Sequence, residues 1–433
     1  MNNDTIAAIS TPAGVGGIAV VRVSGPEALP IVLRHLSVKE LPPRRTVHCR
    51  FDALDDLVAV FFPTGYTGEP TVELSCHGSQ YVQQALLQTL VGDGARMAEA
   101  GEFTLRAFLN GRLNLSQAEA VADLVDAVTP AQHRLAVSQL RGGYAEKLKT
   151  LRQQLLDLTA LLELELDFSQ EDVEFADRTH LRQLLQTLNT ELQSLIGSFV
   201  MGNALKQGIP VAIVGAPNVG KSTLLNALLD DDRAIVSPVP GTTRDTVEGM
   251  LTLGSVTFRL VDTAGLRNTD DAVERLGIER SRKAYEQAMI VVEVLDDPKG
   301  GGTMCADGKC HITVLNKCDL HSHNSKFTIQ NSQFIQVSAL TGEGLDHLKQ
   351  ALLDTVSDRA ADEVLLSNVR HRDALLHVQQ ALQQVGEGLE AGVPADLLAV
   401  DLRDALHHLG TVTGEVTDEE LLGNIFSRFC VGK

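Results

Sequence analysis

The sequence lacks any apolar run long enough to cross a membrane. Its longest apolar stretches, such as Ile209 to Val214 and Met289 to Leu295, are far shorter than the roughly 20 residues that a bilayer requires. No charged-then-apolar signal segment opens the chain. These absences predict a protein without a membrane partner that works in the cytoplasm or an organelle interior, and we expect the cytoplasm.

The chain also lacks paired cysteines. Its six cysteines show no C-x-x-C spacing, which argues against a disulfide framework and a structural zinc site. Cys305, Cys310 and His311 are close enough to suggest a metal site. A fourth ligand at regular spacing is missing, however, and the run Gly300–Gly302 marks a loop. We therefore expect no metal there.

Positive charge is scarce. Lysine and arginine number 37 against 56 acidic residues, for a net charge of −19. The chain thus has no general electrostatic attraction for nucleic acid, so a nucleic-acid partner needs a local basic patch or a second protein. A hydrophobic content of 44% over 433 residues predicts a globular chain of about three domains.

The most informative segment is a phosphate-binding loop. Gly215–Ser222 has the sequence GAPNVGKS and follows the apolar run Ile209–Val214, which predicts a strand. In such a loop the glycines let backbone N–H groups cradle a triphosphate, Lys221 reaches the outer phosphates, and the Ser222 hydroxyl binds Mg²⁺. A helix is expected to begin at the end of this loop.

Further segments follow in the order that a GTPase needs. The run Gly241–Asp245 supplies a switch-loop threonine, and Asp262–Gly265 (DTAG) ends an apolar run with a carboxylate for Mg²⁺. The run Asn316–Asp319 (NKCD) ends another predicted strand, where Asp319 suits the N1–H and amine of guanine. Ser338–Leu340 (SAL) is placed for a backbone contact to the guanine carbonyl.

The nucleotide-binding residues that we predict from these segments lie in five stretches of the chain. They are Asn218, Val219, Gly220, Lys221, Ser222, Thr223, Ser237, Pro238, Val239, Pro240, Gly241, Thr242, Thr243, Asp262, Thr263, Ala264, Gly265, Asn316, Lys317, Asp319, Ser338 and Ala339. Ser222 and Thr243 are the predicted Mg²⁺ ligands.

The remaining sequence divides by pattern. Near the N-terminus, Ile18–Val23 and Val58–Phe62 predict strands and Tyr81–Leu90 predicts a helix, which indicates a small α/β domain. From about Ala118 the pattern becomes helical. Leucines recur every three or four residues over 148–162 and at 181, 184, 188, 192 and 195 with Phe199. Leucine and valine alternate at this spacing over 375–389, and leucines recur again over 398–409.

Two helical blocks therefore flank the GTPase segment. The simplest interpretation is one helical bundle with a Ras-like P-loop domain inserted, because each block has an apolar stripe that must be covered. The alternative is two separate helical domains. Thr417 with Glu420 predicts a capping box for a last helix that contains Leu421, Leu422 and Ile425.

Several segments outside the GTPase region resemble the MnmE (TrmE) family of tRNA-modification GTPases. They are Asp4–Ala8 (DTIAA), Tyr66–Glu69 (YTGE), Cys76–Gly78 (CHG), Gly101–Thr104 (GEFT), Ala107–Gly111 (AFLNG), Gln117–Ala120 (QAEA) and the terminal Phe429–Lys433 (FCVGK). The resemblance implies an N-terminal α/β domain over 1–117 for tetrahydrofolate binding and dimerisation. It implies a helical domain over 118–207 and 357–433, interrupted by a GTPase domain over 208–356.

The resemblance also implies a reaction. Family members form homodimers and work with the flavoprotein MnmG, which carries FAD, in a heterotetramer. They modify C5 of the wobble uridine of tRNA with GTP and a formyl- or methylene-tetrahydrofolate unit, adding an aminomethyl or carboxymethylaminomethyl group. The folate contacts would fall on Arg22, Glu73, Arg112 and Lys433. The family often has lysine at the position of Arg112. Without the family, Arg22 and Glu73 would be interpreted as a surface pair on neighbouring strands.

Three further roles follow from the same resemblance. K⁺ would be held by Asn218, Ser237, Val239 and Thr242, where its charge replaces an arginine finger. Leu266 follows the Asp262–Gly265 segment and cannot orient water, so Glu274 would take that task. Cys430 would face the folate site as a thiol that takes part in tRNA chemistry. The alternatives are a solvated Glu274 at a helix start and a buried apolar Cys430 in the final helical turn.

Two other functions remain open from the sequence. A ribosome-assembly GTPase, or another RNA-associated regulatory GTPase, shares every motif from Gly215 to Ala339. Such proteins usually add a basic RNA-binding module, whereas both flanks here are acidic or mixed. The other possibility is a folate-dependent one-carbon transferase that GTP only regulates.

Overall fold

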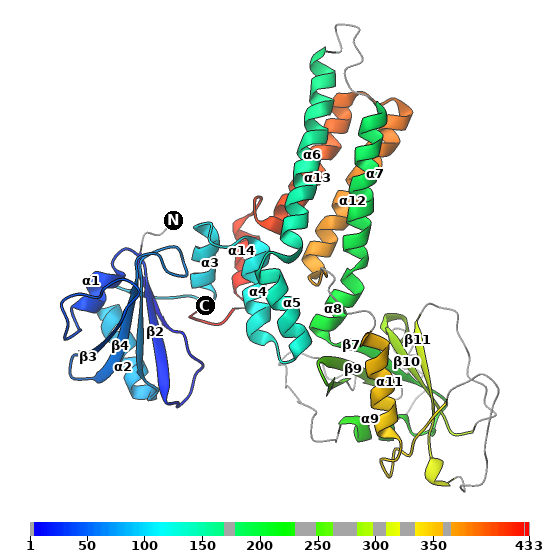
Figure 1. Cartoon of the computed structure of the whole chain (residues 1–433), viewed down its shortest axis with the longest axis horizontal. Coiled ribbons are helices and arrows are strands. Elements are labelled where there is room, and N and C mark those ends of the chain that lie inside the picture. The colour runs from blue at the N-terminus through cyan, green and yellow to red at the C-terminus, as the bar shows by residue number, and fades with distance from the viewer. Residues whose placement is uncertain are drawn as a thin grey trace, which may run out of the picture. The chain divides into compact units, whose positions relative to one another are not determined.

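The computed structural model describes residues 4–168, 178–229, 248–262, 284–297, 309–320, 334–357, 365–427 and 429–432 (Figure 1). The chain divides into two compact units. The first comprises Met1–Val125, Gln139–Thr159 and Ala399–Lys433, and the second comprises Asp126–Ser138 and Ala160–Leu398.

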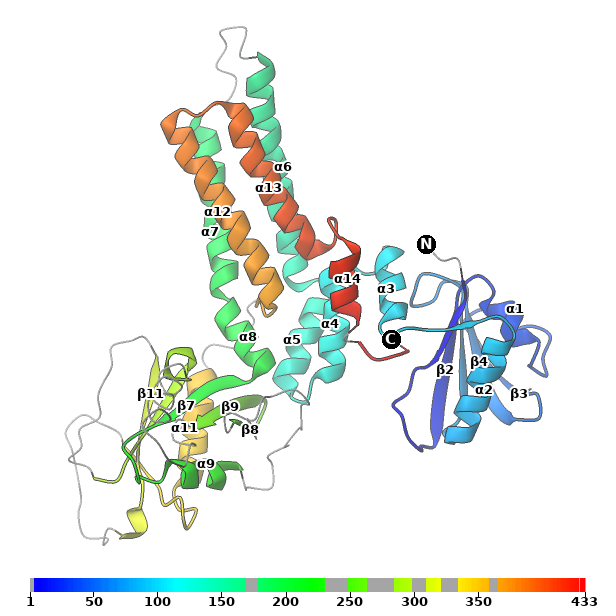
Figure 2. The ribbon, with the colours of Figure 1, turned by 180° about the vertical axis from the view of Figure 1, so that it is seen from behind.

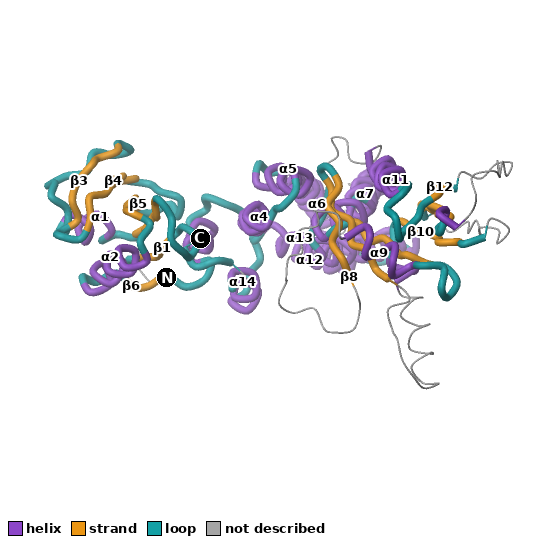
Figure 3. Tube along the Cα trace, turned by 90° about the horizontal axis from the view of Figure 1, so that it is seen from below, coloured by secondary structure: helices purple, strands orange, loops and turns teal. Residues whose placement is uncertain are grey.

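The first unit contains a mostly antiparallel sheet in the order β3-β4-β5-β2-β1-β6. Its strands are β1 (Ile6–Ile9), β2 (Ile18–Ser24), β3 (Thr46–Phe51), β4 (Asp55–Phe62), β5 (Thr71–His77) and β6 (Arg96–Met97). The helices α1 (Ala28–Leu33) and α2 (Gln80–Gly92) lie on one side of it (Figure 3). The predicted strands at Ile18–Val23 and Val58–Phe62 and the helix at Tyr81–Leu90 are confirmed.

Alternation along β2 decides which side chains face the two sides of the sheet. Ala19, Val21 and Val23 are buried in the core under α1 and α2. Arg22 has the opposite orientation, since successive side chains of a strand point to opposite faces. A smaller apolar cluster on Arg22's side includes Ala8 and Phe103.

Helices α3 (Glu102–Leu109), α4 (Leu115–Asp126) and α14 (Glu419–Phe426) complete this side of the first unit. Residues from all three form one apolar cluster, in which Phe426 and Phe429 are buried. Gly101, immediately before α3, has a φ of 68°, and a Cβ there would lie 2.7 Å from the Phe426 carbonyl oxygen. Only glycine fits both the left-handed backbone and this close approach.

The predicted capping box of α14 is wrong by one residue. Asp418, not Thr417, is the N-cap, and its side chain accepts a hydrogen bond from the Leu421 N–H at 2.6 Å. A carboxylate is favoured over a hydroxyl here because it also stabilises the positive end of the helix dipole.

The second unit holds a sheet in the order β12-β11-β10-β7-β9-β8. Its strands are β7 (Ile209–Val214), β8 (Glu248–Leu253), β9 (Val256–Asp262), β10 (Ile290–Leu295), β11 (Cys310–Leu315) and β12 (Ile335–Gln336). Every pairing is parallel except that of β8 with β9. Helices α9 (Lys221–Leu229) and α11 (Leu345–Ser357) contribute to its core. The predicted Ras-like P-loop fold is confirmed.

A helix that precedes this sheet in the sequence packs against a helix that follows it. Helix α7 (Arg178–Gly197) packs against α12 (Val369–Ala391), as Figure 2 shows, and α8 (Phe199–Gln207) leads into β7. The Leu366 N–H, on the returning segment, donates to the Ser198 hydroxyl at 3.0 Å. The GTPase fold is therefore inserted into a helical domain, as predicted.

Two details of the helical prediction are wrong. Leu184 is only half-buried, whereas Leu185 is buried together with the other predicted leucines of α7. The predicted apolar stripe also continued to Phe199 within one helix. Helix α7 instead ends before Ser198, and Phe199 begins α8. The Ser198 hydroxyl donates to the Leu195 carbonyl at 2.7 Å, a local bond that competes with continued helix.

The other helices are α5 (Pro130–Leu140), α6 (Gly143–Phe168) and α13 (Ala395–Thr413). Within the second unit, the Ala131 N–H at the start of α5 donates to the Ser255 carbonyl in the β8–β9 turn at 3.1 Å. In the described ranges, every helix is too short or too polar to cross a lipid bilayer.

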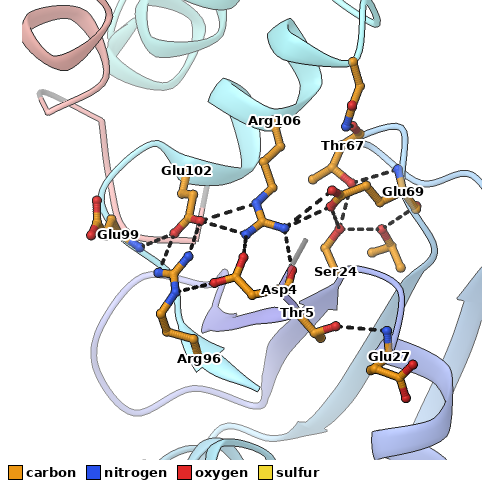
Figure 4. Close-up of polar contacts among 12 residues, drawn as sticks. Asp4, Thr5, Ser24, Glu27, Thr67, Glu69, Arg96, Glu99, Glu102 and Arg106 are labelled. Carbon is orange, nitrogen blue, oxygen red and sulfur yellow. Dashed lines mark hydrogen bonds and ion pairs between the residues drawn. The ribbon is translucent and has the colours of Figure 1, made fainter. Parts of the chain in front are cut away.

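A cluster of charged side chains fixes α3 to the sheet of the first unit (Figure 4). The guanidinium of Arg106 donates to Asp4 at 2.6 Å, to Glu102 at 3.0 Å and to Glu69 at 3.3 Å. Arg96 donates to Asp4 at 2.7 Å and to Glu102 at 2.6 Å. The cluster therefore joins the start of the chain, β6, the loop before β5 and the first turn of α3.

These contacts favour the ionised carboxylates. Hydrogen bonding to Arg96 lowers the pKa of Asp4 more than burial raises it. Burial opposes ionisation of Glu102, but hydrogen bonds from Arg96, the Glu99 N–H and Arg106 outweigh it and lower the pKa. A carboxyl group whose pKa falls on folding stabilises the protein above its unfolded pKa of about 4, and this is lost as the pH falls through the folded value.

We expect Arg106→Met to destabilise the first unit by about 3 kcal/mol, because it removes a nearly buried cation from the partly buried carboxylates of Asp4, Glu69 and Glu102, while Arg96 still pairs with Asp4 and Glu102. The Arg106 side chain is only 9% exposed. Arg34→Met is the matched control, since Arg34 is 57% exposed in its pair with Asp93, and should change stability by less than about 0.5 kcal/mol. Urea unfolding at pH 7 and pH 3 measures both. The Arg106 effect should shrink at pH 3, and equal effects of the two variants would contradict the account.

Candidate functional site

The phosphate-binding loop spans the gap between β7 and α9. Parallel strands place it at the carboxyl edge of the sheet, with the N-terminus of α9 immediately after it. Gly220 has a φ of 97°, and a Cβ there would collide with the Asn316 amide. A helix N-terminus preceded by a glycine loop is a binding site for anions.

The lysine of this loop is buried within it. The ammonium group of Lys221 donates to the Gly215 carbonyl at 2.9 Å and the Ala216 carbonyl at 2.8 Å. These bonds hold a positive charge inside the loop, where phosphate oxygens would meet it. Ser222 and Thr223 follow in the first turn of α9 and are exposed.

Asn316 connects three loops at this edge. Its side-chain nitrogen donates to the Val219 carbonyl at 2.8 Å, and its side-chain oxygen accepts from the Ala339 N–H at 3.0 Å. The residue is 2% exposed. The predicted phosphate loop, the Asn316–Asp319 segment and the Ser338–Leu340 segment therefore meet, as guanine recognition requires.

Asp319 is held in a defined orientation. The Ser338 hydroxyl donates to one of its carboxylate oxygens at 2.6 Å. That bond leaves the other oxygen and the remaining lone pairs available to a base with two neighbouring donors. Asp319 lies in a short 3₁₀ helix, Cys318–Leu320. Burial raises the pKa of the neighbouring Cys318 thiol, and Glu343 and Asp319 add to the shift.

One residue at this edge escaped the sequence analysis. Asp296, the first residue after β10, pairs with Lys317 at 3.1 Å. The same ammonium group donates to the Asn218 carbonyl at 2.9 Å. The sequence feature that could have indicated Asp296 is a carboxylate directly after a predicted parallel strand, since ligands bind at the carboxyl edge of such sheets.

Several predicted site residues lie outside the described residues. They are Ser237, Pro238, Val239, Pro240, Gly241, Thr242, Thr243, Thr263, Ala264, Gly265, Glu274 and Lys433, with Leu266 and Cys305. Asp262 is the last residue of β9 and is paired with Ile213. Across the part of the chain that the structure describes, no group of three or more His, Cys, Asp or Glu side chains is arranged to hold a metal ion.

A second group of predicted residues lies in the first unit. Arg22 and Glu73 are directly opposite on β2 and β5, and the arginine Nε donates to the Glu73 carboxylate at 2.9 Å. The guanidinium also lies 5.7 Å from the centre of the Tyr66 ring and 5.6 Å from that of Phe103. The pair is on neighbouring strands, as the simpler interpretation expected, but two aromatic rings also lie beside its guanidinium.

The C-terminal segment is bonded to elements that flank Arg22. Val431 bridges to Ala100, the Gly101 N–H donates to the Cys430 carbonyl at 3.4 Å, and the Ser10 hydroxyl donates to the Gly432 carbonyl at 3.2 Å. Ser10 follows β1, in which Ala8 is the partner of Arg22. The segment is thus fastened between the start of α3 and the end of the strand next to Arg22.

The cysteine itself is exposed and lies after the last helix. This observation excludes the alternative that Cys430 is a buried side chain in the final helical turn. Arg112 is also exposed and lies beside Gly68 in the loop that precedes β5. Among the predicted folate contacts, Arg22 and Glu73 touch each other.

Comparison with known families matches nearly the whole chain. Residues 5–112 match the family described as the GTP-binding protein TrmE N-terminus, and residues 115–430 match the MnmE helical domain. Among solved structures, the G domain of the T. maritima FeoB iron transporter is similar at 26% identity. The match covers 34% of this chain and 97% of that one with a TM-score of 0.26.

Full-length relatives agree with these families. The tRNA modification GTPase MnmE of Christiangramia forsetii is 46% identical over 471 residues, covering 100% of this chain and 99% of its own length. That of Flavobacterium johnsoniae is 45% identical over 465 residues, covering 100% of both chains. The chain therefore belongs to the MnmE family of tRNA modification GTPases.

Proposed function

We propose that the chain couples GTP hydrolysis to modification of C5 of the wobble uridine in tRNA. In this proposal it works as a homodimer with the FAD-carrying MnmG protein and adds an aminomethyl or carboxymethylaminomethyl group from a tetrahydrofolate one-carbon unit. One observation carries it: the C-terminal segment with the exposed Cys430 is hydrogen-bonded to the start of α3 and to the residue after β1, and these two elements also carry Phe103 and Ala8, the neighbours of Arg22. A GTPase that only regulates ribosome assembly has no need of that arrangement.

The Arg22–Glu73 pair is suited to part of a folate. A pterin offers neighbouring N–H donors to a carboxylate, and the anionic tail needs cations. The Glu73 side chain is 30% exposed, so its oxygens remain accessible to a ligand. Arg22 orients that carboxylate, and the Tyr66 and Phe103 rings restrict the guanidinium. We assign the tail to Arg112 and Lys433.

The phosphate loop is suited to GTP with Mg²⁺. The buried ammonium of Lys221 binds the outer phosphates, while Ser222, in the first turn of α9, is a Mg²⁺ ligand together with Thr243. Asp319 binds the two donors of the guanine edge. Bound Mg²⁺ neutralises charge on the phosphates, and the chain's own residues orient them.

A K⁺ ion is the proposed replacement for an arginine finger. Asn218 stands in the loop at a φ of 64°, a conformation that asparagine tolerates better than most residues. We assign its side-chain oxygen to the ion, with Ser237, Val239 and Thr242, and we assign water orientation to Glu274. Charge neutralisation at that position is worth about 10³–10⁵ in rate in other GTPases.

Asp319→Asn should shift the nucleotide preference from GTP to xanthosine triphosphate. The amide adds a donor that opposes the guanine amine and suits the xanthine oxygen. Hydrolysis of both nucleotides by the wild type and the variant measures the shift. Because Ser338 donates to this carboxylate, Ser338→Ala is a useful comparison, expected to weaken GTP binding without changing base preference. An unaltered preference in Asp319→Asn would assign base recognition to another residue.

Hydrolysis should be faster in K⁺ than in Na⁺, and Asn218→Ala should abolish that difference while nucleotide binding persists. Alanine is strained at positive φ, so Asn218→Gly is the control that removes the side chain without opposing the backbone. Both variants should lose the ion preference. Rates are compared in the two chloride salts at equal ionic strength, and a preference that survives in Asn218→Gly excludes this ligand.

Cys430→Ser should abolish wobble-uridine modification but keep the fold and GTP hydrolysis. Because Cys430 is exposed, serine should leave the melting temperature within about 1 °C. The measurement is nucleoside analysis of tRNA from cells that express only the variant, with wild-type and empty-vector controls and GTPase assays of the purified protein. Normal modification in the variant would refute a chemical role for the thiol. Normal modification with the empty vector would refute the proposed function itself.

A further inference from the structure

Three loops meet where the central strands of the second unit's sheet end. Strand β10 lies between β7 and β11, with Glu293 opposite Val214 and Leu295 opposite Leu315. The phosphate-binding loop follows β7, and the Asn316–Asp319 segment follows β11. The residue directly after β10 therefore lies between the loop for the phosphates and the segment for the base. That residue is Asp296.

Asp296 acts on both loops through one lysine. The ammonium group of Lys317 pairs with the Asp296 carboxylate at 3.1 Å and donates to the Asn218 carbonyl at 2.9 Å. Asp296 is 44% exposed and Lys317 is 35% exposed. Water therefore screens the pair only in part, and its strength lies between that of an exposed pair and a buried one.

The two residues joined by the Lys317–Asn218 hydrogen bond both have a left-handed backbone conformation. Asn218 and Lys317 have φ values of 64° and 63°, a left-handed conformation that is unfavourable for lysine and that asparagine tolerates better than most residues. Such conformations persist only where surrounding contacts hold them. The bond from Lys317 to the Asn218 carbonyl is one of these contacts, and Asp296 determines where the Lys317 ammonium lies.

We propose that Asp296 is a positioning residue for the bound guanine nucleotide and that it slows nucleotide dissociation through Lys317. The carboxylate holds the Lys317 ammonium over the Asn218 carbonyl, so that the phosphate loop and the base-recognising segment keep their spacing. Without this charge, Lys317 is free to turn toward the nucleotide or solvent, and the two loops separate more easily. The proposal rests on the assignment of Asn316–Asp319 to the guanine base.

The test measures dissociation of methylanthraniloyl-GDP by stopped flow. Asp296→Asn keeps the size of the side chain but removes its charge, and we expect the dissociation rate to rise about fivefold. Single-turnover hydrolysis at saturating GTP should stay within about twofold, because the residue does not touch the reacting atoms. Asp346→Asn is the control, since it removes the same charge from a 99% exposed side chain of the same domain, and should leave the dissociation rate unchanged.

A double-mutant cycle distinguishes positioning through Lys317 from a general effect on folding. Lys317→Ala should raise the dissociation rate, and adding Asp296→Asn to it should change the rate by less than about twofold. Asp296→Glu restores the charge and should recover most of the slow dissociation. Additive effects in the cycle, or a dissociation rate of Asp296→Asn equal to that of the wild type, overturn the proposal.

The experiments distinguish a failure of the Asp296 proposal from a failure of the guanine assignment. If Asp319→Asn keeps its GTP preference while Asp296→Asn still speeds dissociation in a Lys317-dependent way, Asp296 positions the phosphate loop and the base assignment alone fails. If Asp296→Asn lowers the melting temperature of the nucleotide-free protein and leaves dissociation unchanged, the residue serves only the fold.

Discussion

The first unit depends on the ion pairs that Arg96 and Arg106 make with Asp4, Glu69 and Glu102. Arg106 is nearly buried, so its charge requires partners that are also removed from water. Those partners come from segments distant in sequence, and their geometry positions α3 against the sheet. Phe103 on α3 then lies beside Arg22, and Gly101 before α3 receives the backbone of the last helix. A displacement of α3 would move Phe103 and the C-terminal segment together.

The nucleotide site in the second unit is organised differently. Its described loops are held mainly by backbone groups, by the buried amide of Asn316 and by the buried ammonium of Lys221, which bonds to carbonyls and not to a carboxylate. This suits a site that must accept and release a highly charged ligand, because backbone dipoles attract phosphate without needing a counter-ion of their own. The exception is the Asp296–Lys317 pair. It lies at the border between the phosphate loop and the base-recognising segment, where a partly screened charge can control exchange.

In the proposed function the two units contribute different chemistry. The GTPase sheet carries the phosphate loop and Asp319, whereas the first unit carries Cys430, Arg22 and Glu73. Strong net negative charge makes general attraction of tRNA unfavourable. The charge is consistent with a second protein that brings the RNA, as the proposed MnmG partner would. Among the described residues, the exposed thiol of Cys430, on a segment fastened to the start of α3 and to Ser10, is the feature that a purely regulatory GTPase leaves unexplained.

Much of the fold was predictable because it depends on local pattern. The strands Ile209–Val214 and Ile18–Val23 and the helix after Lys221 follow from apolar runs, glycine turns and short-range spacing. The errors arose where two local interactions compete, because residue spacing alone does not show which one forms. Asp418 displaced Thr417 as the cap, and Ser198 ended a helix that the leucine pattern continued.

Motif order alone determined that this chain is a GTPase, since the loop that carries Lys221 and the segment Asn316–Asp319 each follow a strand of the Ras-like sheet. The tertiary structure decided what no spacing contains. It placed Asp296 between two loops that are more than 90 residues apart, and it fastened Gly432 to Ser10 across 422 residues. Contacts of that kind depend on how the strands pair and how closely backbones approach, which are properties of the packed molecule. The physical reason is that the chemistry of a side chain depends only on its own residue type, whereas the fold determines which other residues it contacts.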